Sequence, residues 1–157
     1  MWASQVRRRR VVTENGGRVD EREDELLADE LAALAAVAGG WGGLTRLVAK
    51  LMRKNVHEIE LAVALPFEDT VERVARVLGR AGRRVRLGSE LCADQRMIRV
   101  VAGGGVGGMN PVVVTALVTK GGASDSQVRL RAAAKEGLIR QRAGERTAAR
   151  LAALLDT

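Results

Sequence analysis

Alternation of apolar and polar residues is clearest after the first third of the chain. Ile59, Leu61 and Val63 alternate with charged or small residues, and Pro66 closes the run. A period of two places successive side chains on opposite faces of a strand. The pattern therefore predicts a half-buried strand over residues 57–65.

Four more strands are predicted further along. Those at 84–87, 97–102 and 128–132 alternate, whereas 112–118 is apolar at nearly every position. Such a strand is typical of the centre of a sheet that is covered on both faces. Polar and glycine-rich clusters leave only short connections, which favour antiparallel pairing.

Helical spacing marks the rest of the chain. Apolar side chains three and four residues apart predict helices over 24–38, 44–54, 69–80 and 138–155. Asp69, with Glu72 three residues later, is the predicted N-cap of the third helix. The acidic residues of 20–30 lack the glycine of a calcium-binding loop, so we interpret them as a solvated helix start.

These elements predict an α+β fold. Its antiparallel sheet has about five strands, with helices packed on one face in the order strand–helix–four strands–helix. An N-terminal helical extension precedes this domain. Two helices on one face leave the second side of 112–118 uncovered, so the N-terminal helices or a second copy of the chain must cover it.

The expected domain organisation has three parts. Residues 1–22 form a flexible basic and acidic tail, 23–54 two short helices, and 55–157 a compact α+β domain. The tail is predicted because charges of one sign are grouped together along this part of the chain: residues 11–30 carry eight negative and two positive side chains. Translation that begins at Met52 would omit this extension, so its presence in the native protein stays open.

The composition is basic, with a formal net charge of +7. A basic balance suits an anionic partner, but an arginine-rich solvated surface from a GC-rich genome is the favoured explanation. A single cysteine, Cys92, cannot form an internal disulfide and favours a reducing cytoplasm. No apolar run approaches the ~20 residues of a membrane span.

Candidate chemistry is sparse. Residues 103–108 match a G-x-G-x-x-G pattern, but Pro111 and a valine-rich strand follow instead of the helix that a dinucleotide site requires. His57 and Cys92 are the only residues of their types, so neither a multi-histidine metal site nor a catalytic constellation is predicted. We therefore expect no enzyme activity, metal or cofactor.

The segment Ala134-Lys135-Glu136-Gly137-Leu138-Ile139-Arg140-Gln141 leads into the closing helix. Together with the element order over residues 57–156, it resembles START/Bet v 1-like (SRPBCC) helix-grip domains of small bacterial proteins. This resemblance implies an apolar ligand between the sheet and the last helix. A five-stranded sheet with two helices also resembles one half of the TATA-binding-protein fold.

The leading hypothesis is a non-catalytic binding module of helix-grip type for a small apolar or amphipathic ligand, or for a protein partner. Its candidate ligand-binding residues are Arg140, Gln141 and Lys135, because Arg140 falls on the apolar side of the closing helix. Self-association is expected through the second face of 112–118.

The alternative is a nucleic-acid-binding module that uses arginines on the outer face of the sheet. If Ile59, Val85, Ile98 and Val128 point inward, the outward residues are Arg84, Arg86, Arg99, Arg129 and Arg131. Cross-strand pairs with Glu58 and Glu60 also explain these arginines. RNA-reading sheets usually present aromatic side chains as well, and the predicted strands contain none.

Overall fold

The computed structural model describes residues 16–37, 39, 48–49, 52–85, 93–104, 110–136 and 142–156. Its elements are α1 (Gly16–Val37), β1 (Arg53–Val63), α3 (Phe67–Ala81), β2 (Gly82–Val85), β3 (Gln95–Gly104), β4 (Asn110–Lys120), β5 (Ser126–Glu136) and α4 (Ala143–Leu155). This order confirms the predicted α+β fold of strand, helix, four strands and helix after an N-terminal helix.

The five strands form one antiparallel sheet in the order β1-β5-β4-β3-β2. β3, β4 and β5 pair with their sequence neighbours, because short connections allow only hairpins. β1 pairs instead with the last strand, so that Ile59 lies opposite Leu130. β4 is the middle strand, as its apolar sequence predicts, and β1 and β2 are the edges.

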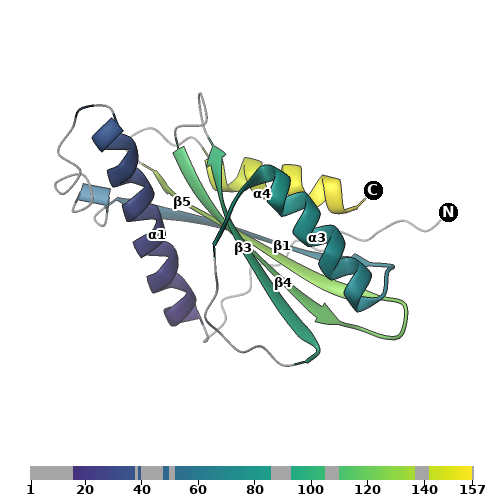
Figure 1. Cartoon of the computed structure of the whole chain (residues 1–157). Helices are drawn as coiled ribbons and strands as arrows, with labels where there is room; N and C mark the ends of the chain where they lie inside the picture. The colour runs from purple at the N-terminus through teal and green to yellow at the C-terminus, as the bar shows by residue number, and fades with distance from the viewer. Residues whose placement is uncertain are drawn as a thin grey trace.

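α3 and α4 cover one face of the sheet (Figure 1). Alternate residues of the strands point toward them, and the buried cluster between the layers is aliphatic apart from Phe67. Gly144 allows the first turn of α4 to lie close on β5, since a Cβ there would be 3.1 Å from the carbonyl oxygen of Ala132. We name this side the helix face.

α1 lies on the opposite side, which we name the α1 face (Figure 1). Leu27 packs in a second buried cluster with Val101, Val113 and Ala133. The N-terminal helix therefore supplies a second cover for part of β4, which was one of the two covers expected. Most of the predicted helix at 44–54 lies outside the described residues, and β1 already begins at Arg53.

The predicted cap of α3 is wrong. The helix begins at Phe67 after Pro66, whose φ of −54° suits a helix start, and no side-chain cap bond forms. Asp69 therefore lies within the first turn. Thr70 closes that turn, because its Oγ1 donates to the carbonyl of Leu65 at 3.2 Å.

The predicted orientation of β2 is also wrong. Val85 is the register partner of Arg99, so it points to the α1 face instead of sharing the inward side with Ile59. Arg84 consequently points toward α3 and donates to the carbonyl of Ala75 at 2.8 Å. The helix passes into this strand at Gly82 without a loop, and alternation in four residues could not reveal which side faces inward.

Candidate functional site

Side chains on the α1 face form rows across the sheet, because paired residues of neighbouring strands point to the same side. The two rows farthest from α1 are named the groove rows. The outermost consists of Ala62, Gln127, Thr119 and Gln95, and its neighbour consists of Glu60, Arg129, Leu117 and Met97. The next row toward α1, named the arginine row, consists of Glu58, Arg131, Thr115 and Arg99. The row after it, named the valine row, consists of Val56, Ala133, Val113 and Val101.

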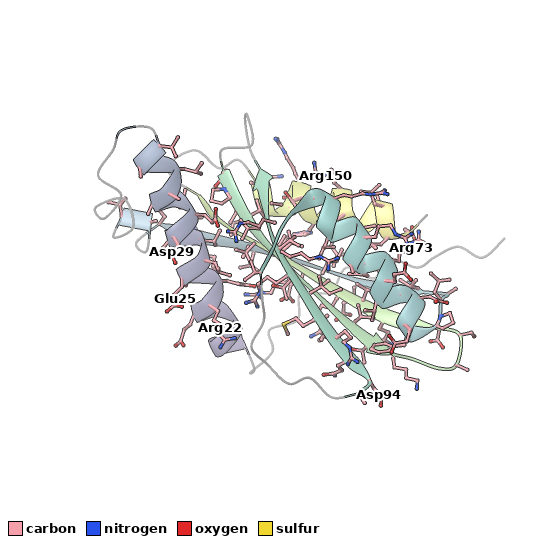
Figure 2. The ribbon with its side chains drawn as sticks, in the orientation of Figure 1. Arg22, Glu25, Asp29, Arg73, Asp94 and Arg150 are labelled. Carbon is pink, nitrogen blue, oxygen red and sulfur yellow. The ribbon has the colours of Figure 1, made fainter. Side chains whose placement is uncertain are left out.

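The groove rows border an open groove of about 600 Å³. Its lining includes Glu60, Ala62, Gln95, Leu117, Thr119, Gln127 and Arg129. Figure 2 labels Asp94, the residue before Gln95, at the end of β3 that lies away from α1. The groove therefore occupies the half of this face that α1 does not cover.

A charged pair spans two strands in the groove. Arg129 lies directly opposite Glu60, and its Nε and Nη2 are 3.0 and 2.8 Å from Glu60 Oε1. Both side chains are more than a third exposed, so the pair contributes little to stability, on the order of 0–1 kcal/mol. The groove thus presents both signs of charge beside the apolar side chain of Leu117.

The arginine row lies beneath α1. Arg99 is 3% exposed, and its Nε donates to Thr115 Oγ1 at 2.8 Å. Arg131 donates from Nη1 to Glu58 Oε1 at 2.7 Å and from Nε to both carboxylate oxygens of Glu23 at 3.1 and 3.2 Å. Glu23 belongs to α1 and is fully buried.

Burial dominates the electrostatics of this cluster. It raises the pKa of the Glu23 carboxyl, although the charges of Arg131, Lys54 and Arg99 act in the opposite direction. Burial likewise lowers the pKa of Arg99, and the neighbouring Glu23 opposes that shift. Charged groups are therefore held here against a desolvation cost that their pairing only partly offsets.

Further ion pairs join α1 to the sheet. Lys135 Nζ lies 2.8 Å from Asp24 Oδ1, and Lys54 Nζ lies 3.6 Å from Glu23 Oε2. Arg83 on β2 pairs with Glu30. The helix thus contributes carboxylates to this contact and the sheet contributes most of the cations.

The predicted ligand residues are not brought together within the described part of the chain. Arg140 and Gln141 lie outside the described residues, whereas Lys135 is buried beneath α1, on the face opposite α4. Among the predicted nucleic-acid residues, Arg86 also lies outside the described ranges. The remaining four are described, and Arg99, Arg129 and Arg131 share the α1 face.

Sequence reasoning missed the role of Glu23 and Asp24, which it interpreted as a solvated helix start. One indication was present. Glu23 precedes Leu27 by four residues, and Leu27 precedes Leu31 by four, so the carboxylate extends the apolar stripe of α1 by one turn.

The glycine run at 103–108 joins β3 to β4, and the element after it is a strand, as expected. Within the described ranges, no three His, Cys, Asp or Glu side chains gather as metal ligands. Among the described helices, none has both the length and the apolarity that a membrane crossing needs.

No family model and no curated protein matched the chain. Among solved structures, it is similar to the Zhui aromatase/cyclase from Streptomyces sp. R1128, with a TM-score of 0.31 and 14% sequence identity. That match covers 66% of this chain and 84% of the other. Likeness at this level supports no conclusion about activity, so function rests on the geometry of the site.

Proposed function

We propose that the protein is a non-catalytic binding module that has the order of elements of a helix-grip domain and holds a small amphipathic ligand on the α1 face, the side of the sheet opposite α4. The open groove of about 600 Å³ is the observation that carries this proposal. Small-molecule sites commonly have volumes of roughly 300–1,000 Å³ and combine apolar walls with a few polar groups.

The lining suits a ligand with both apolar and polar parts. Leu117 and Ala62 supply apolar surface on the floor. Gln95, Gln127 and Thr119 offer amide and hydroxyl groups that can donate or accept hydrogen bonds. These groups fit a small ligand that is partly buried and partly in contact with water.

The nucleic-acid alternative has weaker support. Arg99 is buried, and both Arg129 and Arg131 are bonded to carboxylates of their own fold. Arg84 points to the other side of the sheet. An arginine that already binds a carboxylate must exchange that partner before it can hold a phosphate.

A protein partner, including a second copy of the chain, is the competing occupant of the groove. Self-association was expected because two helices leave the second side of β4 uncovered. Since α1 covers Val113, only the groove end around Leu117 still needs a cover. Light scattering at micromolar concentration tests this occupant, and a strict monomer would remove self-association.

The ligand proposal is tested with 1-anilinonaphthalene-8-sulfonate, a fluorescent amphipathic anion. We expect the native protein to bind it, and Thr119→Arg to abolish binding by filling the groove. Ala149→Arg, at an exposed position of α4, is the matched control and should leave binding unchanged. Equal binding by both variants would place the probe elsewhere and overturn the proposal.

A further inference from the structure

We propose that the arginine row is the head-group end of the groove site, that its ligand is a medium-chain carboxylate, and that Glu23 occupies this end as an internal substitute. This inference rests on the proposed function of the groove and specifies the chemical class of its ligand.

Glu23 and Leu27 together present the features of such a ligand. The Glu23 carboxylate accepts from Arg131 Nε at 3.1 and 3.2 Å and is fully buried. One helical turn later, Leu27 packs with Val113 and Ala133. The sheet beneath α1 thus binds a carboxylate and an apolar group side by side, the two parts of a fatty acid. Leu27 lies on the valine row, so it matches the ligand in chemistry, whereas the ligand chain would run in the other direction, along the groove.

Arg99 supplies unused binding capacity. Within the described part of the chain, its side chain makes one hydrogen bond, from Nε to Thr115 Oγ1. A guanidinium has five N–H donors and matches the geometry of a carboxylate. A ligand carboxylate can therefore be held by Arg99 and Arg131 together. The Glu23 carboxylate, by contrast, accepts hydrogen bonds from Arg131 and lies 3.6 Å from Lys54 Nζ.

The arginine row and the groove are continuous. Thr115 and Leu117 are two residues apart on β4, as are Arg131 and Arg129 on β5, and all point to the α1 face. From the arginine row to the outermost groove row, at Thr119, is four residues of extended strand. At ~3.3 Å per residue this is about 13 Å, a length that a medium-chain fatty acid can span.

Exchange of Glu23 for the ligand conserves the main interaction. One carboxylate leaves Arg131 as another arrives, so this buried guanidinium keeps a charged partner, whose loss would be costly. Lys54 and Lys135 lose their carboxylate partners on α1 and become accessible to water as the helix leaves. The apolar contact of α1 is small, because its buried cluster on the sheet has four members. The helix is thus attached largely by ion pairs, including those of Asp24 and Glu30.

The surroundings of the arginine row favour a small amphiphile over a polyanion. The valine row lies on one side of it and Leu117 on the other, so apolar surface flanks the charge. Phe67, the one aromatic residue in the described part of the chain, belongs to the cluster on the helix face. Base stacking therefore has no described partner on this face.

The test uses calorimetric titration of the full-length protein with decanoate and with decanol, which has the same chain and no charge. We expect Glu23→Gln to bind decanoate about tenfold more tightly than the native protein, because the competing charged hydrogen bonds are weakened. Adding Arg99→Gln to that variant should weaken decanoate binding about tenfold, again the value of one charged hydrogen bond. Decanol binding should stay unchanged in both variants.

Glu25→Gln is the matched control, since Glu25 is an exposed residue of α1 and is labelled in Figure 2 on the outer side of that helix. It should behave as the native protein does. If the double variant does not fold, Arg99→Lys in its place should retain part of the decanoate affinity. In the native protein, decanoate should also speed hydrogen exchange of the α1 amides, because the helix is released.

Three results would overturn the inference. Equal affinity for decanoate and decanol, unaffected at Arg99, would leave the groove proposal intact and remove the head-group site. Absence of binding by both ligands would remove the groove proposal as well. Tight RNA binding by Glu23→Gln at low salt, without decanoate binding, would assign the arginine row to a polyanion.

Discussion

The two faces of the sheet are stabilised by different kinds of interaction: apolar packing on the helix face, and mainly ion pairs on the α1 face. On the helix face, twenty buried residues form one cluster that is aliphatic apart from Phe67. On the α1 face, four buried apolar residues are accompanied by the buried charges of Glu23, Arg99 and Lys135. Close-packed apolar contacts specify one arrangement, whereas ion pairs can be exchanged for others of the same charge. The helix face therefore contributes most of the packing that holds the fold together, whereas the contact between α1 and the other face is more readily exchanged.

The largest expected difference between the faces concerns leucine truncation. Leu130 is fully buried on the helix face, so Leu130→Ala should cost about 2–5 kcal/mol of unfolding free energy. Leu117 is only half-buried in the groove, and Leu117→Ala should cost less than about 1.5 kcal/mol, because little apolar area leaves the interior. Urea denaturation measures both. Equal costs would mean that the two faces contribute alike.

Glycine substitutions test how closely the chain is packed where α3 continues into β2. A Cβ on Gly82 would lie 2.2 Å from the carbonyl oxygen of Val101, so Gly82→Ala should cost about 1–3 kcal/mol. Gly79, near the end of α3, is the control. The nearest neighbours of a Cβ there are atoms of the flexible Arg84 side chain, from 3.5 Å, and Gly79→Ala should stabilise the helix by up to about 1 kcal/mol. Destabilisation by both would indicate that α3 tolerates no added volume.

The contact between α1 and the sheet should depend on pH, because it contains the buried carboxyl group of Glu23. Because burial raises the pKa of Glu23, the folded state binds its proton more tightly than the unfolded state does. This stabilisation is present below the ordinary value of 4.5 and is lost as pH rises through the raised pKa. A tenfold difference in proton affinity between the two states corresponds to about 1.4 kcal/mol of unfolding free energy.

Protection of the α1 amides from hydrogen exchange, referred to the intrinsic rates at each pH, should therefore decrease as pH rises through that window. Glu23→Gln should remove this trend, whereas Glu25→Gln should retain it. Identical profiles for the two variants would show that another group governs the docking of α1.

The smallest effect is expected where α4 begins. Arg142 has a φ of +50°, in the left-handed region that disfavours side chains, and its contact with Glu145 is exposed and 3.9 Å long. Arg142→Gly should stabilise the protein by about 1 kcal/mol or less, since glycine relieves the strain but loses more chain entropy on folding. Thermal unfolding measures the change, and a clear loss of stability would assign Arg142 a packing role.

Much of the fold could be predicted from local pattern. Alternation around Ile59 predicted a half-buried strand, and the nearly continuous apolar run of β4 predicted the middle strand, because each pattern reflects how many faces are buried. The orientation predicted for β2 was wrong, because alternation over four residues is too short to show which face Val85 points to. The cap of α3 failed because Pro66 starts a helix without a side-chain bond.

The candidate site was less predictable. Cross-strand pairing of Glu60 with Arg129 was anticipated as one explanation of the arginines, and the structure contains it. The burial of Glu23 was not anticipated, because a carboxylate in an acidic stretch is usually solvated. Its position depends on Arg131, which lies 108 residues away, and no local pattern carries that information.

The pairing of β1 with β5 has a consequence for the order of folding. Partners in these strands are 63 to 83 residues apart in the sequence, whereas those of β3 with β4 and of β4 with β5 are 6 to 24 residues apart. The three-stranded meander can form from local contacts, but the sheet closes only after a long loop has been ordered, which slows folding. During synthesis α1 emerges before the strands that carry Val113, Ala133 and Arg131. The acidic segment of α1 is therefore synthesised before the strands on which it packs in the folded protein.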